Sequence, residues 1–141
     1  MGGGALSSKA HAMKSFILAW FAAAIVFLGL DAIWLTQVAP RFTRPIIGAL
    51  LRDGVRPWPG VAFYLIYITG LVALAVEPTA ETAVSRAALR GGMLGVVAYA
   101  TYDLTNQATL RVWSTSLTLA DIFWGAAISA VAAGAARVVT R

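Results

Sequence analysis

The sequence predicts an all-α membrane protein, a bundle of four transmembrane helices with a short interfacial helix between the first and second spans. Hydrophobic residues make up 60% of the 141 residues, charged residues only 12%, and the mean hydropathy is +0.78. A soluble domain typically carries about 25% charged residues. This chain therefore lacks the polar groups to cover a water-facing surface, and its length suits one domain rather than two.

Four apolar segments are long enough for a helix across a bilayer, which takes roughly 20 residues. They lie at about 15–38, 58–76, 87–110 and 116–139. The first is too long for a signal peptide and no small-x-small cleavage site follows it, so we expect it to remain as a helix. Residues 1–12 are small and polar and precede a second methionine, Met13. We expect them to be a disordered tail or an expression remnant, outside a single domain of residues 13–141.

The connection between the first two spans, RFTRPIIGALLRDG, has a pattern of its own. Pro45 suits a first helical position, and Asp53-Gly54 is a stop signal. The apolar residues between them fall on one helical face, with Arg44 and Arg52 at its margins. This pattern predicts a short amphipathic helix in the headgroup layer, with an ordinary basic loop as the alternative. The arginines expected to contact lipid phosphates are Arg41, Arg44, Arg52 and Arg56.

Small residues on the third and fourth segments indicate how the helices pack. Small-xxx-small faces are formed by Gly91 and Gly95 on the third segment, and by the run Gly125-Ala126-Ala127 with Ser129, Ala133 and Gly134 on the fourth. Such faces let helix backbones approach closely in a bilayer, which predicts a tight bundle. Basic residues are divided almost equally between the two sides, so the charge rule leaves the membrane orientation open.

The composition excludes several kinds of chemistry. The chain has no cysteine, which rules out disulfides, thiolate metal sites and cysteine nucleophiles. Its single histidine, His11, lies before the first span, which rules out histidine-based zinc or haem sites within the bundle. The net charge of +5 comes from residues that flank apolar spans. We therefore expect lipid headgroups, and not nucleic acid, as the partner of these basic residues.

Three aspartates fall inside the predicted spans. Asp31 and Asp103 each lie seven residues before the end of a span, and Asp121 lies five residues after the start of the fourth. Because successive spans alternate in direction, all three lie roughly 7–11 Å below the same membrane surface. A carboxylate in hydrocarbon costs a few kcal/mol and normally faces the bundle interior or a water-filled cavity. The common depth therefore predicts one shared polar pocket.

Polar and aromatic neighbours support this pocket. Tyr99 lies four residues before Asp103, and Tyr102 four before Asn106, so each pair shares a helical face. The pattern D-x-x-W occurs in both the first and the fourth span. The residues predicted to line the pocket are Asp31, Trp34, Tyr64, Tyr67, Tyr99, Tyr102, Asp103, Thr105, Asn106, Asp121 and Trp124.

Each aspartate also has a purely structural interpretation. The T-x-x-D pattern that ends at Asp121 resembles a capping box, and a helix N-terminus favours a carboxylate. Asp31 could form a salt bridge with Arg41 or Arg44. Asp103 could be tethered to a polar neighbour or to another helix, although it lies toward a helix C-terminus, where the dipole disfavours negative charge. The aromatic residues could form an interfacial belt.

Four stretches together resemble a known family. They are LDAIWL at Leu30–Leu35, FYLIYITGLVALAVEP at Phe63–Pro78, AYATYDLTNQATL at Ala98–Leu110 and ADIFWG at Ala120–Gly125. The chain is similar in these to the DUF2177 family of small bacterial membrane proteins, over essentially Met13 to the C-terminus. The resemblance implies four transmembrane helices and a multi-pass location in the bacterial cytoplasmic membrane. It implies no activity.

Three functions are compatible with the sequence. The first is binding or transport of a small polar or cationic ligand or a proton, for which a narrow bundle would need a homodimer. The second is a lipid-modifying enzyme, or its accessory subunit, in which Asp31, Asp103 and Asp121 hold Mg²⁺ or Mn²⁺. The third is a scaffold of a membrane complex, whose polar residues serve only helix association. No compact metal motif occurs, so no cofactor is predicted, although a divalent metal stays open.

Overall fold

The computed structural model describes residues 3–78 and 81–141, and this part of the chain is helical with no strand. The first helix, α1 (Gly3–Ile33), continues through a five-residue π-helix, η1 (Trp34–Val38), into α2 (Ala39–Ile47) and a 3₁₀ turn, η2 (Gly48–Leu50). Next come α3 (Pro57–Leu71), a second π-helix, η3 (Val72–Val76), α4 (Val84–Thr109) and α5 (Thr115–Val139).

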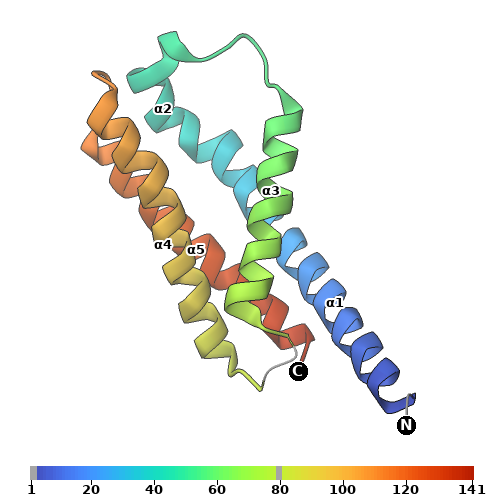
Figure 1. Cartoon of the computed structure of the whole chain (residues 1–141). Coiled ribbons are helices and arrows are strands. Elements are labelled where there is room, and N and C mark those ends of the chain that lie inside the picture. The colour runs from blue at the N-terminus through green and yellow to red at the C-terminus, as the bar shows by residue number, and fades with distance from the viewer. Residues whose placement is uncertain (1–2, 79–80) are drawn as a thin grey trace.

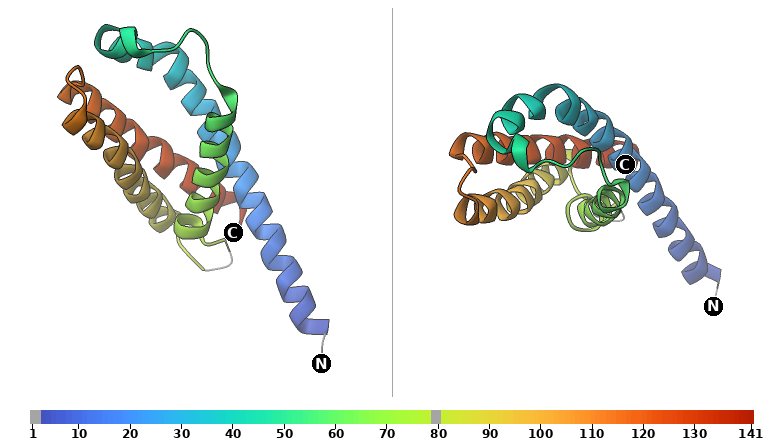
Figure 2. Two further views of the ribbon diagram at one scale, coloured as in Figure 1. Left: turned by 45° about the horizontal axis from the view of Figure 1, so that its top comes forward. Right: turned by 90° about the horizontal axis from the view of Figure 1, so that it is seen from above.

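The helices form a bundle built around a hairpin of α4 and α5 (Figure 1). α1 packs across α5, and α3 lies beside α1, while η3 reaches both α4 and α5. The two views of Figure 2 show the first turns of α1 projecting beyond the other helices. α2 and the α4–α5 turn lie at one end of the bundle, and the α3–α4 connection lies at the other, near the C-terminus.

Three helical stretches are long and apolar enough to cross a membrane: Gly4–Leu50, Pro57–Val76 and Thr115–Val139. The all-helical prediction is therefore confirmed, together with three membrane-spanning candidates. α4 has 26 residues, a length of about 39 Å, but arginines near its start and the Y-D-L-T-N-Q stretch near its end make it more polar. The expected third span, at 87–110, therefore remains a prediction.

Two helix ends differ from what the sequence suggested. Residues 3–12 form the first turns of α1, and their assignment as a tail or an expression remnant stays a prediction. Their sequence is rich in alanine with leucine and lysine, which favour helix, and they extend a helix that is already nucleated. The helix expected to start at Pro45 begins instead at Ala39, with Pro40 in its first turn and Pro45 inside it. Its place in the headgroup layer remains a prediction.

Pro40 gives a physical reason for the π-helix before it. A proline lacks the N–H that would bond the carbonyl of Thr36 four residues earlier. The Ala39 N–H bonds the carbonyl of Trp34, five residues back, which is the π pattern. The hydroxyl of Thr36 also donates to the Ala32 carbonyl at 2.7 Å. The helix is thereby widened at one place without being broken.

Glycines bring α4 and α5 into backbone contact. A Cβ atom added at Gly91 would lie 2.6 Å from the Ser129 carbonyl oxygen, and one at Gly95 would lie 2.1 Å from that of Gly125. A Cβ at Gly125 would lie 2.2 Å from the ring of Tyr99. These contacts leave no room for a side chain, so the small-residue faces close the hairpin.

The apolar core lies where α1, α3, η3 and α5 meet. Its largest fully buried side chains include Phe27, Ile68, Leu71 and Ile128. Large apolar side chains are also exposed along the outside of the helices, among them Ile25, Ile66 and Phe123. A soluble monomer rarely exposes so extensive an apolar surface, whereas contact with lipid tails requires it.

Arg137 joins α5 to the connection between α3 and α4. Its side chain is buried, and it donates from Nε to the Thr82 carbonyl at 2.5 Å and from Nη1 to the Pro78 carbonyl at 3.3 Å. We expect Arg137→Ala to lower the free energy of unfolding by about 1–2 kcal/mol, because buried carbonyls lose their donors. Reversible unfolding in detergent measures this. Arg141→Ala, which removes an exposed arginine, is the control, and equal losses for the two variants would contradict the assignment.

Candidate functional site

A cavity of about 490 Å³ lies within the half of the bundle that carries α2 and the α4–α5 turn. Every α-helix of the bundle contributes to it, and η1 does so as well. Its lining residues are Asp31, Trp34, Leu35, Ala39, Thr43, Phe63, Tyr64, Ala98, Tyr99, Tyr102 and Asp121. The structure thus brings six of the predicted residues to one cavity: Asp31, Trp34, Tyr64, Tyr99, Tyr102 and Asp121.

Asp31 is held by two side-chain donors from other helices. The hydroxyl of Tyr64 donates to its Oδ2 at 2.6 Å, and the indole Nε1 of Trp124 donates to its Oδ1 at 3.2 Å. The side chain is only 6% exposed. The two hydrogen bonds fix the position and orientation of the Asp31 carboxyl. The predicted salt bridge from Asp31 to Arg41 or Arg44 does not form in the described part of the chain.

Aromatic rings form much of the cavity wall. Trp34 stacks on Trp124 with ring centroids 4.7 Å apart and an interplanar angle of 6°. Phe42 lies parallel to Trp34 at 6.5 Å. Tyr64 and Tyr99 face the same space from α3 and α4. The wall of the cavity is therefore largely aromatic.

The π-helix η1 keeps one face of a long helix turned toward the cavity. Asp31, Leu35, Ala39 and Thr43 are spaced four apart, and all four line it. In a regular α-helix, each step of four residues drifts by about 40° around the axis. A π segment has more residues per turn, which offsets the drift. The π-helix that precedes Pro40 therefore helps to keep these four residues on the cavity side of the helix.

Asp121 lies in the second turn of α5 and lines the cavity. The helix is capped by Ser114, whose hydroxyl accepts from the Leu117 N–H at 3.2 Å. The hydroxyl of Thr118 donates to Gln107 Oε1 at 2.8 Å instead of capping the helix. The capping-box interpretation of Asp121 is therefore wrong. Trp34 and Asp121 line the same cavity from η1 and α5.

Asp103 is fully buried behind the cavity wall. Within the described residues, neither of its carboxyl oxygens accepts a hydrogen bond from a donor group. Asp121 is a neighbouring carboxyl across the α4–α5 contact.

The remaining predicted pocket residues lie outside the cavity. Tyr67 is buried in the core, where its hydroxyl is 2.7 Å from that of Ser129. Trp124 contacts Asp31 from behind the lining. Thr105 donates to the carbonyls of its own helix, and Asn106 lies beside Tyr102.

The other polar groups are placed as follows. Arg41, Arg44, Arg52 and Arg56 are all exposed at the end of the bundle nearest the cavity. Among residues 3–78 and 81–141, no group of three histidine, aspartate or glutamate side chains is arranged to hold a metal ion. A divalent metal held by Asp31, Asp103 and Asp121 stays a prediction.

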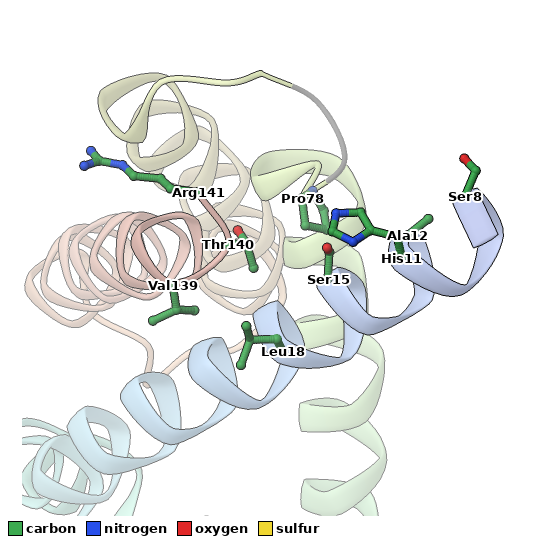
Figure 3. Close-up of a pocket in the computed structure, with 9 residues that line it drawn as sticks. All are labelled: Ser8, His11, Ala12, Ser15, Leu18, Pro78, Val139, Thr140 and Arg141. Atoms are coloured by element: carbon green, nitrogen blue, oxygen red, sulfur yellow. The ribbon is translucent and has the colours of Figure 1, made fainter. Parts of the chain in front are cut away.

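A second cavity of about 420 Å³ lies at the opposite end, between the start of α1 and the end of α5. In Figure 3 the ring of His11 lies beside Pro78, and the side chain of Arg141 extends away from both. No predicted site residue lies in this cavity.

The family model described as "Predicted membrane protein (DUF2177)" matches residues 16–138, nearly the whole chain. The chain belongs to the DUF2177 family. No curated protein and no solved structure matches it. The range matched to DUF2177 includes Asp31, Asp103 and Asp121. It also includes every residue that lines the larger cavity.

Several cavity residues of this DUF2177 protein were not predicted. They are Leu35, Ala39, Thr43, Phe63 and Ala98. A spacing of four residues from Asp31 would have identified the first three, had the π-helix been anticipated. Phe42, which backs Trp34, carries no comparable signal because it lies beyond the predicted first span.

Proposed function

We propose that this DUF2177 protein binds a small organic cation, such as a quaternary ammonium group, in the aromatic and carboxylate-lined cavity. The observation that carries the proposal is the placement of Asp31 and Asp121 on a cavity walled by tryptophan and tyrosine rings. Aromatic cages of this kind recognise quaternary ammonium groups through cation–π attraction. The two carboxyl groups add the opposite charge.

The charge and size of the cavity favour a cation over an anion. Its lining includes two aspartates and, within the described residues, no lysine or arginine. The charge on Asp31 is already satisfied by two donors, so it can attract a ligand without collapsing onto a protein cation. A volume of about 490 Å³ falls in the range of small-molecule sites.

The proposal includes a membrane arrangement. α4 is the third of four spans, paired with α5 along the glycine contact, and the protein resides in the cytoplasmic membrane of a bacterium. α2 lies at the headgroup level, where exposed Arg41 and Arg44 contact lipid phosphates. Figure 1 shows α3 and α4 diverging toward the end that holds the cavity. A homodimer provides a transport path if the protein transports its ligand.

Titration with tetramethylammonium tests the proposal. We expect saturable binding to the purified protein in nanodiscs, measured by calorimetry. Trp34→Ala should weaken binding at least tenfold, in line with about 1–2 kcal/mol for a desolvated cation–π contact, and Trp34→Phe should retain most of it.

Trp58→Ala is the matched control, because Trp58 is 70% exposed and lies outside the cavity. Its affinity should equal that of the unaltered protein. Absence of binding, or equal weakening by Trp58→Ala and Trp34→Ala, would contradict the proposed site.

A further inference from the structure

We propose that the cavity takes a dication, a ligand whose two ammonium groups are joined by a short chain, with Asp31 holding one group and Asp121 the other. This inference rests on the proposed function and narrows it from organic cations in general to one substrate class. It also makes Asp121 the residue that distinguishes a dication from a monocation.

The repeated D-x-x-W pattern places both aspartates on the cavity. α1 packs against α5, and the two helices run in opposite directions (Figure 1). Trp124, three residues after Asp121, donates from Nε1 to Asp31 Oδ1 at 3.2 Å. Trp34, three residues after Asp31, stacks on Trp124 with ring centroids 4.7 Å apart. The two motifs therefore lie side by side in opposite directions, and both aspartates line the same cavity.

The same two contacts bound how far apart the aspartates lie along the helices. Asp31 level with Trp124 corresponds to an offset of three residues between Asp31 and Asp121, and Trp34 level with Trp124 corresponds to six. At 1.5 Å per residue, the offset is about 5–9 Å. Two ammonium groups joined by a four-carbon chain suit this span, because five bonds of about 1.5 Å hold their nitrogens about 6 Å apart.

Each carboxyl group has an aromatic neighbour of its own, which gives two subsites. Tyr64 from α3 donates to Asp31 Oδ2 at 2.6 Å. Tyr99 from α4 lies level with Asp121 of α5, one turn beyond the glycine contact between these two helices. Both tyrosines line the cavity. A carboxylate beside an aromatic ring suits an ammonium group, which gains both the opposite charge and cation–π attraction.

The charge of the cavity favours a dication over a monocation. Two carboxyl groups line it, and within residues 3–78 and 81–141 no lysine, arginine or histidine does. A monovalent cation pairs with one carboxylate and leaves the other without a counter-charge, which is unfavourable away from water. A dication pairs with both. The volume of about 490 Å³ has room for two ammonium groups and a short chain.

Calorimetry with two permanently charged probes tests the inference on the purified protein in nanodiscs of zwitterionic lipid. The dication is 1,4-bis(trimethylammonio)butane, and the monocation with the same chain is butyltrimethylammonium. Neither probe carries a titratable proton. We expect one dication to bind per protein, at least tenfold more tightly than the monocation.

Asp121→Asn should bring the ratio of the two affinities to about one, because an amide leaves the second ammonium group without a counter-charge. A general disturbance of the cavity would weaken both probes alike, so the ratio reports the second carboxyl group. Asp53→Asn, at an exposed loop aspartate, should keep the ratio of the unaltered protein.

Three outcomes would count against these assignments. Equal affinity of the unaltered protein for the two probes would overturn this inference and leave the proposed function standing. Binding of neither probe would overturn the proposed function itself. A ratio that stays at tenfold or more in Asp121→Asn would overturn the assignment of the second subsite to Asp121.

Discussion

Replacing Asp31 by alanine is expected to weaken tetramethylammonium binding at least a hundredfold. The substitution removes a cavity carboxylate and leaves the Tyr64 hydroxyl and the Trp124 indole without their acceptor. Truncating one partner of a buried charge pair typically costs about 2–5 kcal/mol, and about 2.7 kcal/mol corresponds to a hundredfold change. Calorimetry in nanodiscs measures the effect.

Two further variants separate charge from shape. Asp31→Asn keeps the size of the side chain and should also bind poorly, because the negative charge is lost. Asp53→Ala removes a carboxylate that is exposed in a loop and should bind normally. Normal affinity of both Asp31 variants, with the fold intact by circular dichroism, would rule Asp31 out as a ligand-binding residue.

Gly95→Ala is expected to destabilise the bundle by about 3 kcal/mol, at the upper end of the overpacking range. The new Cβ would lie 2.1 Å from the Gly125 carbonyl oxygen, and the obstructing atom belongs to a backbone that cannot move aside alone. α4 and α5 must separate for the methyl group to fit, which also disturbs Asp103 and Asp121 one to two turns away. Reversible unfolding in detergent gives the magnitude.

Gly70→Ala is the matched control for this substitution. Gly70 is also a helix-interior glycine, but a Cβ added there meets nothing within 4 Å. Alanine favours helix over glycine by up to about 1 kcal/mol, so this variant should be as stable as the parent or slightly more so. Similar destabilisation by both substitutions would mean that the glycine contact does not hold the hairpin together.

Hydrophobic segmentation predicts most of the helical bounds. Segments 58–76 and 116–139 nearly coincide with α3–η3 and α5, because apolar length is set by the bilayer and is visible in the sequence. The helix bounds after the first span, in η1 and α2, could not be predicted from apolar length. Pro45 was expected to start a helix, but the helix begins at Ala39, after a π segment that precedes Pro40, and it continues past Pro45.

The sequence predicts how deep each aspartate lies in the membrane. It does not predict toward which side of its helix axis each aspartate is turned in the folded bundle. Counting residues from the span ends puts Asp31, Asp103 and Asp121 at one level, and the structure places two on a cavity and the third behind it. Thr105 is also near that level, yet its hydroxyl bonds its own helix. Helical periodicity alone could not separate these outcomes, because they depend on how α4 rotates against α5.

Locating a heavy-atom analogue of the ligand tests the cation site most directly. Tetramethylarsonium has the shape and charge of tetramethylammonium, and its arsenic scatters X-rays anomalously. In crystals grown with it, we predict one strong arsenic peak within the cavity lined by Asp31, Trp34 and Asp121. A peak only in the cavity beside His11, or no peak on the protein at concentrations that saturate binding in solution, would contradict the account.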